Sequence, residues 1–155
     1  MKYLLFLLIA LPTLFLLESS QIKKEPKELK IGKKAPLASV QLEGIDGKAY
    51  SLNDLNKSNG LIVVFSCNTC PFVVGNDNFE GWEKQYNALY KKASENNIGM
   101  VLLNSNEAKR ENEDSKEEMV AHAKKQQYAM PYLIDTDSKL ADAFGAKTCL
   151  LYTSP

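Results

Sequence analysis

Short runs of apolar residues alternate with longer amphipathic stretches through the middle of the chain. Residues 61–65 (Leu-Ile-Val-Val-Phe) are all apolar, with Gly60 before them and Ser66 after them. A run without polar alternation is typical of a strand that is covered on both faces, as in a parallel sheet. Residues 98–103 and 131–134 have the same apolar character, and they predict a second and a third strand.

A helical pattern lies between the first two predicted strands. Its apolar residues recur at steps of three and four: Phe79, Trp82, Tyr86, Leu89 and Ala93. The spacing predicts an amphipathic helix that ends near residues 96–97, with a kink at its start, where residues 75–78 interrupt the pattern. We interpret the aromatic stripe as core packing rather than as a binding surface.

Capping signals predict two further helices. Ser115 and Glu118 have the spacing of a capping box, which opens a helix that runs to about Gln127. Asp137 is expected to cap the last helix, and Gly145 is expected to end it.

Upstream of the first long apolar run, the pattern predicts a β-hairpin. Residues 37–42 and 48–51 flank Asp46-Gly47, a dipeptide that readily takes the positive φ values of a tight turn. Ser51 then begins a short capped turn or helix that reaches Leu55. From the apolar run onward, strands and helices alternate, which predicts parallel strands joined by right-handed crossovers. The predicted fold class is α/β, a central sheet flanked by helices with an N-terminal hairpin.

Composition limits the class of protein. The chain has 155 residues, which is enough for one domain, and its hydrophobic content of 45% excludes wholesale disorder. The 19 basic and 19 acidic residues cancel, which argues against a nucleic-acid binder, because such proteins normally carry a basic excess. Three cysteines are too few for a disulfide framework that holds a small secreted domain together.

The N-terminal segments differ in composition from the predicted domain. Lys2 precedes an apolar stretch, residues 4–17, which is short of the ~20 apolar residues of a membrane span and has the shape of a secretory signal. We expect residues 1–21 to be a signal peptide or a short membrane anchor, and the protein to be exported to a periplasmic or other extracytoplasmic compartment. Residues 22–34 are rich in lysine and lack an apolar period, so we expect a charged linker that can also approach a membrane surface.

The last seven residues are unusual. Residues 149–155 (Cys-Leu-Leu-Tyr-Thr-Ser-Pro) match the translation of a transposase adapter used in sequencing libraries. We expect them to be an adapter-derived tail, so that Cys149 is not a biological cysteine and the domain, residues 35–148, lacks its last strands. The alternative is a real strand over residues 149–153, which their apolar content permits.

The chemistry is expected at Cys67 and Cys70, which lie between the first buried strand and the next helix. Catalytic groups of open α/β sheets collect at the carboxyl ends of the strands. A thiol at a helix N-terminus meets unpaired N–H groups and a partial positive charge, which favour the thiolate and can lower its pKa to ~3.5–7.5. Pro71 suits the first helical position, which would put Cys70 at the cap.

Other roles for the two cysteines have less support. A structural zinc site needs two more ligands, and the chain has one histidine and no second cysteine pair. Haem attachment needs a histidine after the second cysteine, where the chain has Pro71. A structural disulfide stays open as an alternative, because an exported protein meets oxidants, although so small a loop adds little stability. We therefore expect a redox dithiol with no metal and no cofactor.

The arrangement resembles the thioredoxin-like redoxins, and within them the peroxiredoxin-like subgroup of the thiol-specific antioxidant family. The resemblance covers about residues 31–148 and is carried by these segments: Gly32-x-x-Ala35-Pro36, Asp46-Gly47-Lys48, Cys67-x-x-Cys70-Pro71, Leu103-Asn-Ser-Asn106, Pro131-Tyr-Leu-Ile-Asp135 and Ala143-Phe-Gly145. It implies a thioredoxin-like fold and redox chemistry at Cys67 and Cys70. It also implies protein thiols or disulfides as substrates, with a redox partner that the resemblance does not identify.

The resemblance leaves the roles of the two sulfurs open. By analogy with thioredoxins, Cys67 is the exposed attacking thiol and Cys70 the buried resolving thiol. Ser66 stands where thioredoxins often carry Trp, so Cys67 is expected to be open to solvent. By analogy with peroxidases, Cys70 attacks a peroxide, but Cys67 replaces the Thr or Ser that the family has three residues earlier.

We therefore expect a thiol–disulfide oxidoreductase that acts through Cys67 and Cys70. The first alternative is a peroxiredoxin-like thiol peroxidase that uses Cys70. The second is a non-catalytic binding module in which the two cysteines form a structural disulfide.

The remaining polar residues are expected to be structural. His122 is expected on a solvated helix face, and residues 107–118 in an exposed loop and helix start. Asn104 and Asn106 can line the site, but capping or turn formation is the preferred interpretation. In the family that the chain resembles, a cis-proline faces the dithiol and comes soon after the segment that matches residues 146–148; the adapter-like tail replaces it here, and we do not assign its role to Pro155. The resemblance also implies further strands beside residues 61–65, whose absence would leave that strand as an uncovered edge.

Overall fold

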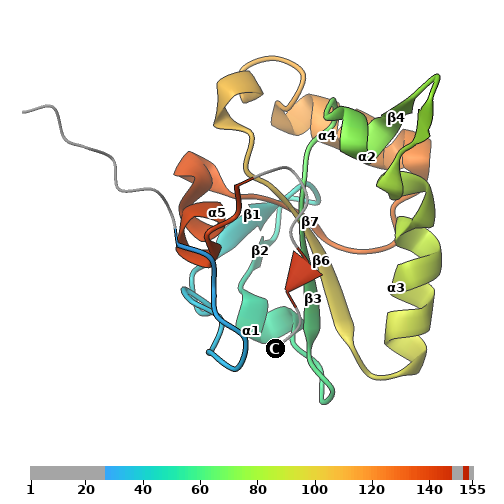
Figure 1. Ribbon diagram of the computed structural model, residues 1–155. Helices are drawn as coiled ribbons and strands as arrows, with labels where there is room; N and C mark the ends of the chain where they lie inside the picture. The colour runs from blue at the N-terminus through green and yellow to red at the C-terminus, as the bar shows by residue number, and fades with distance from the viewer. Residues whose placement is uncertain (1–26, 148–151, 154–155) are drawn as a thin grey trace, which may run out of the picture.

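A mixed six-stranded sheet forms the centre of the molecule. The computed structural model describes residues 27–147 and the backbone of residues 152–153. The sheet has the order β2-β1-β7-β6-β3-β8 (Figure 1). Its strands are β1 (Leu42–Gly44), β2 (Ala49–Tyr50), β3 (Leu61–Ser66), β6 (Gly99–Asn104), β7 (Tyr132–Ile134) and β8 (Tyr152–Thr153).

The three strands predicted from apolar runs are parallel neighbours. β3 pairs with β6 from Leu61↔Gly99 to Ser66↔Asn104, and β6 pairs with β7. All six residues of β6 and all three of β7 are buried, as expected for strands that are covered on both faces. The predicted parallel α/β core is confirmed, and it brings the carboxyl ends of the three strands to one edge of the sheet.

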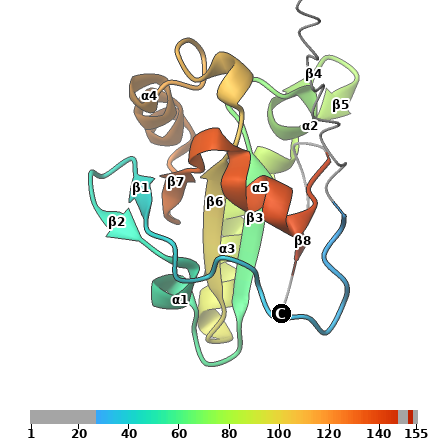
Figure 2. The ribbon, with the colours of Figure 1, turned by 90° about the vertical axis from the view of Figure 1, so that its left-hand side faces the viewer.

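Helices cover both faces of this sheet. α1 (Leu52–Leu55) and α5 (Lys139–Phe144) lie on one face, while α2 (Pro71–Val74), α3 (Tyr86–Glu95) and α4 (Lys116–Gln126) lie on the other (Figures 1 and 2). Leu61, Val63 and Phe65 of β3 point into the first layer, and Val64 points into the second. Short 3-10 helices precede or connect these elements: η1 (Trp82–Gln85), η2 (Glu107–Lys109) and η3 (Thr136–Ser138).

The N-terminal hairpin forms, but its first strand is shifted along the chain. β1 starts at Leu42, whereas residues 36–39 form turns that are closed by a Val40 N–H to Leu37 C=O hydrogen bond. The turn at Gly47 has a φ of 78°, as predicted for Asp46-Gly47. The prediction of a strand over residues 37–42 was therefore wrong except at its end.

The aromatic stripe is not one helix. Residues 75–80 form a small antiparallel hairpin of β4 (Gly75–Asn76) and β5 (Phe79–Glu80), and the α-helix begins only at Tyr86. Phe79 and Trp82 are exposed, so the expectation that they belong to the core was wrong. The prediction of one helix fails because the chain forms a hairpin at the residues where the apolar period begins.

The two later helices have the expected positions. Ser115 caps α4 by accepting the Glu118 N–H, and Gly145 ends α5 with a φ of 70°. The cap of α5 is not Asp137, however. The carboxylate of Asp135, ten residues before Gly145 and fully buried, accepts the N–H groups of the first turn of α5.

The edge beyond β3 is partly covered. Val63 and Val64 pair antiparallel with Thr153 and Tyr152 of β8. The expectation that residues 61–65 form an uncovered edge is thereby corrected for these two residues. Residues 1–26 and the rest of the last eight residues lie outside the described part, so the predicted signal or anchor and the predicted adapter-derived tail are predictions that the structure does not address. None of the helices in residues 27–147 is long and apolar enough to cross a membrane.

Candidate active site

The two cysteines lie where the central strand meets a short helix. Cys67 follows directly after β3, and Cys70 is the N-cap of α2, with φ −67° and ψ 125°. Pro71 is the first residue of α2, where its missing N–H costs nothing. The predicted place of Cys70 at the helix cap is confirmed.

The burial of the two thiols is the reverse of the thioredoxin analogy. Cys67 is only 2% exposed and packs in the apolar cluster with Val64 and Val73, whereas Cys70 is half-buried. The expectation that Cys67 is open to solvent was wrong, because α2 and the core beneath it cover this side chain whatever residue stands at position 66. Cys70 is the more exposed residue of the two.

A hydrogen bond connects the two cysteines. The backbone N–H of Cys70 donates to Cys67 Sγ at 3.1 Å, and the two sulfurs are not joined by a disulfide. An N–H that points at a sulfur favours a negative charge on it. The sequence predicted N–H donors at the helix N-terminus, and in the structure the Cys70 N–H donates to the buried Cys67 sulfur.

Asn68, the first of the two residues between the cysteines, is held by three hydrogen bonds. The N–H of Asn68 donates to Asp114 Oδ1 at 2.7 Å, and its Nδ2 donates to the backbone carbonyl of Glu113 at 2.8 Å. The hydroxyl of Tyr132 donates to Asn68 Oδ1 at 3.0 Å. The loop between the sulfurs is therefore fixed to β7 and to the segment that precedes α4.

Asp114 is the centre of a buried polar network. Besides Asn68, its carboxylate accepts hydrogen bonds from Asn104 Nδ2 and Asn106 Nδ2, both at 2.7 Å. Asn104 also donates to the hydroxyl of Tyr132, whose pKa is raised above its ordinary value chiefly by burial. Asp114 and Asn104 are fully buried. Sequence reasoning missed Asp114, because a charged residue in a charge-dense segment reads as exposed.

Asn104 and Asn106 form the turn that was the preferred interpretation, and they also bind Asp114. The N–H of Asn106 donates to Asn104 Oδ1, which is the predicted turn. Their amide groups in addition bind Asp114, which lies directly beneath the cysteine loop. Six of residues 107–118 are exposed and five are half-buried, but Asp114 is buried, so the expectation of an exposed loop and helix start is wrong for Asp114.

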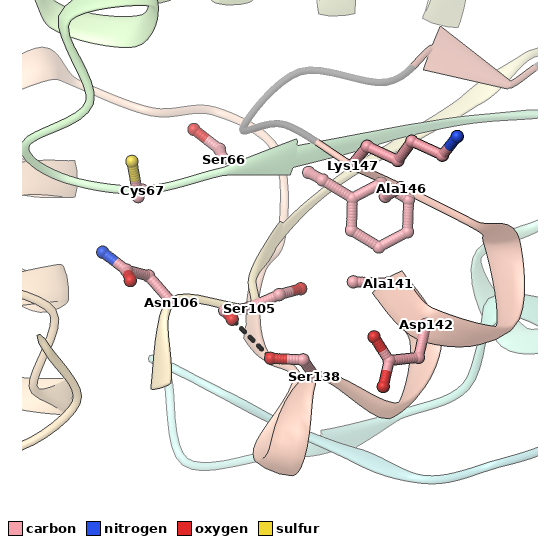
Figure 3. Close-up of a pocket in the computed structure, with 10 residues that line it drawn as sticks. Ser66, Cys67, Ser105, Asn106, Ser138, Ala141, Asp142, Ala146 and Lys147 are labelled. Atoms are coloured by element: carbon pink, nitrogen blue, oxygen red, sulfur yellow. Dashed lines mark hydrogen bonds between the residues drawn. The ribbon is translucent and has the colours of Figure 1, made fainter. Parts of the chain in front are cut away.

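A hollow of about 270 Å³ opens beside the cysteine loop (Figure 3). Figure 3 shows Ser66 and Cys67 on one side, Ser105 and Asn106 on another, and α5 across from β3. The remaining lining residues are Phe65, Ser138, Ala141, Asp142, Ala146 and Lys147. The hollow is lined by the end of β3, by the residues that follow β6, and by η3, α5 and the residues after α5.

His122 does not lie on a solvated helix face. Its Nε2 lies 2.6 Å from Oε2 of Glu83, a buried residue of η1. The same carboxylate accepts hydrogen bonds from Gln126 Nε2 and from the hydroxyl of Tyr128, both at 3.0 Å. Burial, together with this carboxylate, raises the pKa of Tyr128. The cluster fastens the segment after the cysteines to α4, so the expectation for His122 was wrong.

Exposed aromatic side chains follow Cys70 along the chain. Phe72 in α2 is 60% exposed, and Phe79 and Trp82 are also exposed. The rings of Phe72 and Phe79 meet edge to face at a centroid distance of 6.2 Å. Three exposed apolar side chains thus lie within the twelve residues that follow Cys70. Within residues 27–147, no three His, Cys, Asp or Glu side chains come together as a metal site.

Comparisons with known proteins agree with this architecture. A family model described as the AhpC/TSA family matches residues 31–152, and no curated protein matches the chain. Among solved structures, an uncharacterized conserved protein from Geobacillus kaustophilus is 29% identical with a TM-score of 0.70, over 79% of this chain and 61% of that one. A hypothetical protein from Sinorhizobium meliloti 1021 is 28% identical with a TM-score of 0.65, over 81% and 64%.

A more distant match is a secreted disulfide oxidoreductase from Mycobacterium tuberculosis, 14% identical with a TM-score of 0.54, over 75% of this chain and 80% of that one. At that identity the likeness shows the fold alone. The chain spans less than two thirds of the length of the first two proteins. The predicted thioredoxin-like fold is confirmed.

Proposed function

Because the chain belongs to the AhpC/TSA family of thioredoxin-like redoxins, we propose that it is a thiol–disulfide oxidoreductase that works through Cys67 and Cys70. One observation carries the proposal. Two cysteines, one buried and one half-buried, stand at the carboxyl end of the central parallel strand, and the loop between them is held by a buried network. Catalytic groups of such sheets gather at this edge.

Cys70 makes the first attack in this scheme, because it is the more exposed of the two cysteines. Its thiolate attacks one sulfur of a substrate disulfide, the substrate S–S bond breaks, and the other substrate sulfur leaves as a thiolate that takes up a proton. Cys67 then loses its proton and attacks the Cys70 sulfur, which closes the Cys67–Cys70 disulfide and releases the second substrate thiol. Two electrons pass from the dithiol to the substrate.

The buried position of Cys67 suits the second step. Its sulfur already receives the Cys70 N–H at 3.1 Å, so the anion that must form there meets a donor before the reaction begins. The tightly held Asn68 keeps the two sulfurs within one short loop. An intramolecular attack from a fixed neighbour outcompetes the escape of the substrate.

A polypeptide is the substrate class that best fits the surroundings of Cys70. Phe72, Phe79 and Trp82 present apolar surface on the segment that follows it, and aromatic side chains of this kind are enriched where proteins bind each other. We propose protein thiols or disulfides as substrates, with a second protein that restores the redox state. An extracytoplasmic location, with a membrane tether through the N-terminal segment, fits the apolar stretch over residues 4–17 and is proposed with it.

A thiol peroxidase is the second candidate, and the accessibility of Cys70 is the observation that favours it. In that reaction the Cys70 thiolate attacks a peroxide oxygen, the O–O bond breaks and a sulfenic acid forms with release of an alcohol or water. Cys67 then condenses with the sulfenic acid, which yields the same intramolecular disulfide and one water.

The test uses the full chain with Cys149→Ser as background, so that the third cysteine cannot contribute. Cys67→Ser lacks the resolving thiol, so it should trap a mixed disulfide with a protein substrate that has been reduced and then reoxidised. Cys70→Ser lacks the attacking thiol and should trap none. Trapping in Cys70→Ser alone would reverse the roles of the sulfurs. Peroxide consumption that needs Cys70, without any trapping, would replace the proposal by the peroxidase. Absence of both activities, with a disulfide that resists millimolar reductant, would leave a binding module.

A further inference from the structure

We propose that Asp114 is a positioning residue for the Cys67–Cys70 pair, and that its buried charge favours the disulfide over the reduced dithiol. The inference rests on the proposed thiol–disulfide chemistry and adds a residue that no motif in the chain identifies. Asp114 lies in the segment before α4, far from the cysteines in sequence, and the fold carries it directly beneath their loop.

The contact with the loop is short and buried. Asp114 Oδ1 accepts the N–H of Asn68 at 2.7 Å, and this N–H belongs to the peptide bond that follows Cys67. Asp114 is fully buried and Asn68 nearly so. The carboxylate is thus placed one peptide unit from Cys67 and is shielded from water, where the interaction between two charges is strongest.

The carboxylate is compensated by amide groups and not by a cation. Its other partners are Asn104 Nδ2 and Asn106 Nδ2, each at 2.7 Å. The guanidinium of Arg110 lies nearby, but it donates to the backbone carbonyls of Asn104 and Asp114 and pairs with Glu107 at 3.1 Å. In the described part of the chain, no Lys or Arg side chain forms an ion pair with Asp114. Buried charges are ordinarily paired with an opposite charge, whereas this carboxylate has amide donors as its direct partners, and Arg110 reaches it only through Asn104 Oδ1 and the backbone.

That charge acts on one redox state more than on the other. A disulfide is neutral, whereas the reduced pair becomes a thiolate as the pH rises, and a nearby negative charge disfavours the thiolate. Asp114 therefore shifts the equilibrium toward the Cys67–Cys70 disulfide. At the same time its hydrogen bond to Asn68 holds the loop in the shape in which the Cys70 N–H reaches Cys67 Sγ.

The experiment measures the redox equilibrium of the full chain, in the Cys149→Ser background, against mixtures of reduced and oxidised dithiothreitol over a range of pH. Asp114→Asn keeps an oxygen that can accept the Asn68 N–H, and it removes the charge together with the oxygen that accepts Asn106 Nδ2. We expect it to move the equilibrium constant toward the dithiol by about tenfold, which is ~30 mV for a two-electron couple. The difference from the parent protein should shrink at low pH, where both thiols are protonated in either protein.

Glu113→Gln is the matched control. It removes the same charge from the neighbouring residue, whose side chain is exposed and pairs only with Lys109 across 3.4 Å. We expect its equilibrium constant to stay with that of the parent at every pH, because water screens an exposed charge. A purely structural role for Asp114 would give no pH dependence.

Asn106→Ala covers the case in which Asp114→Asn does not fold. It removes one donor from the carboxylate at a partly exposed position and leaves the charge in place, so the equilibrium should move in the opposite direction, toward the disulfide. An Asp114→Asn constant equal to that of the parent at all pH values overturns the inference while the proposed function stands, and an unmoved Asn106→Ala constant does the same if the first variant is unfolded. A parent protein whose cysteines never form the disulfide refutes the proposed function, and this inference with it.

Discussion

Replacement of Glu83 by Ala tests whether a buried carboxylate holds the segment that follows Cys70, residues 71–85, against α4. Glu83 is 6% exposed and lies in η1, between the hairpin that follows α2 and the start of α3. Its two oxygens meet three groups from α4 and the residues after it: His122 Nε2 at 2.6 Å, Gln126 Nε2 at 3.0 Å and the Tyr128 hydroxyl at 3.0 Å. Truncation leaves all three without this acceptor.

The expected cost follows from these contacts. A hydrogen bond to a charged group contributes roughly 1.5–3 kcal/mol to stability, so three independent bonds would sum to roughly 4.5–9 kcal/mol. The bonds share one acceptor group, and water can replace part of them at the partly exposed His122 and Tyr128, so we expect a loss of about 3–4 kcal/mol in the free energy of unfolding. Glu83→Gln keeps the length and one acceptor oxygen, so it should lose about half as much.

Urea unfolding followed by tryptophan fluorescence is a suitable assay, because the single tryptophan, Trp82, is the neighbour of Glu83. With a slope of about 2 kcal/mol/M, the midpoint should fall by about 1.5–2 M without a change of slope. Glu80→Ala is the control, since Glu80 is exposed and its ion pair with Lys84 should contribute ~0.5 kcal/mol or less. A midpoint for Glu83→Ala equal to that of Glu80→Ala would refute the role assigned to the cluster.

Two further predictions concern pH and packing. Burial raises the pKa values of Tyr128 and Tyr132, so the folded chain keeps both protons at pH values where the unfolded chain has lost them. The free energy of unfolding should therefore fall as the pH rises above about 10, by up to ~1.4 kcal/mol per pH unit for each tyrosine, and Tyr128→Phe should remove one of these slopes in urea titrations; an unchanged slope would contradict the assignment. A Cβ at Gly81 would lie 2.1 Å from the carbonyl oxygen of Val73 and 2.3 Å from the N of Gly75, both backbone atoms, so Gly81→Ala should lower the free energy of unfolding by about 2 kcal/mol. A urea midpoint equal to that of the parent would show that the backbone around Gly81 shifts without loss of stability.

The elements predicted correctly are those whose signals are local. The continuous apolar run of β3 indicates a strand that is covered on both faces, and the Ser115 cap begins α4 at the expected residue. The position of Cys70 at a helix cap follows from the restricted φ of Pro71. The aromatic stripe is also a local signal, but it predicted the wrong structure, because a spacing of three and four also occurs by chance across the hairpin of residues 75–80.

The sequence by itself determined the alternating α/β order and the placing of two cysteines between a buried strand and a helix. Only the tertiary structure decided which sulfur is accessible, and which polar residues are buried around the pair. The contacts responsible join residues far apart in the chain: Asn68 and Asp114 are separated by 46 positions, and Glu83 and His122 by 39. From a local pattern, each charged residue is predicted to be solvated, because transfer of a charge out of water is unfavourable. Once folding removes the water, the same residue must find its hydrogen bonds within the protein, and the packing of the whole domain determines where those partners are.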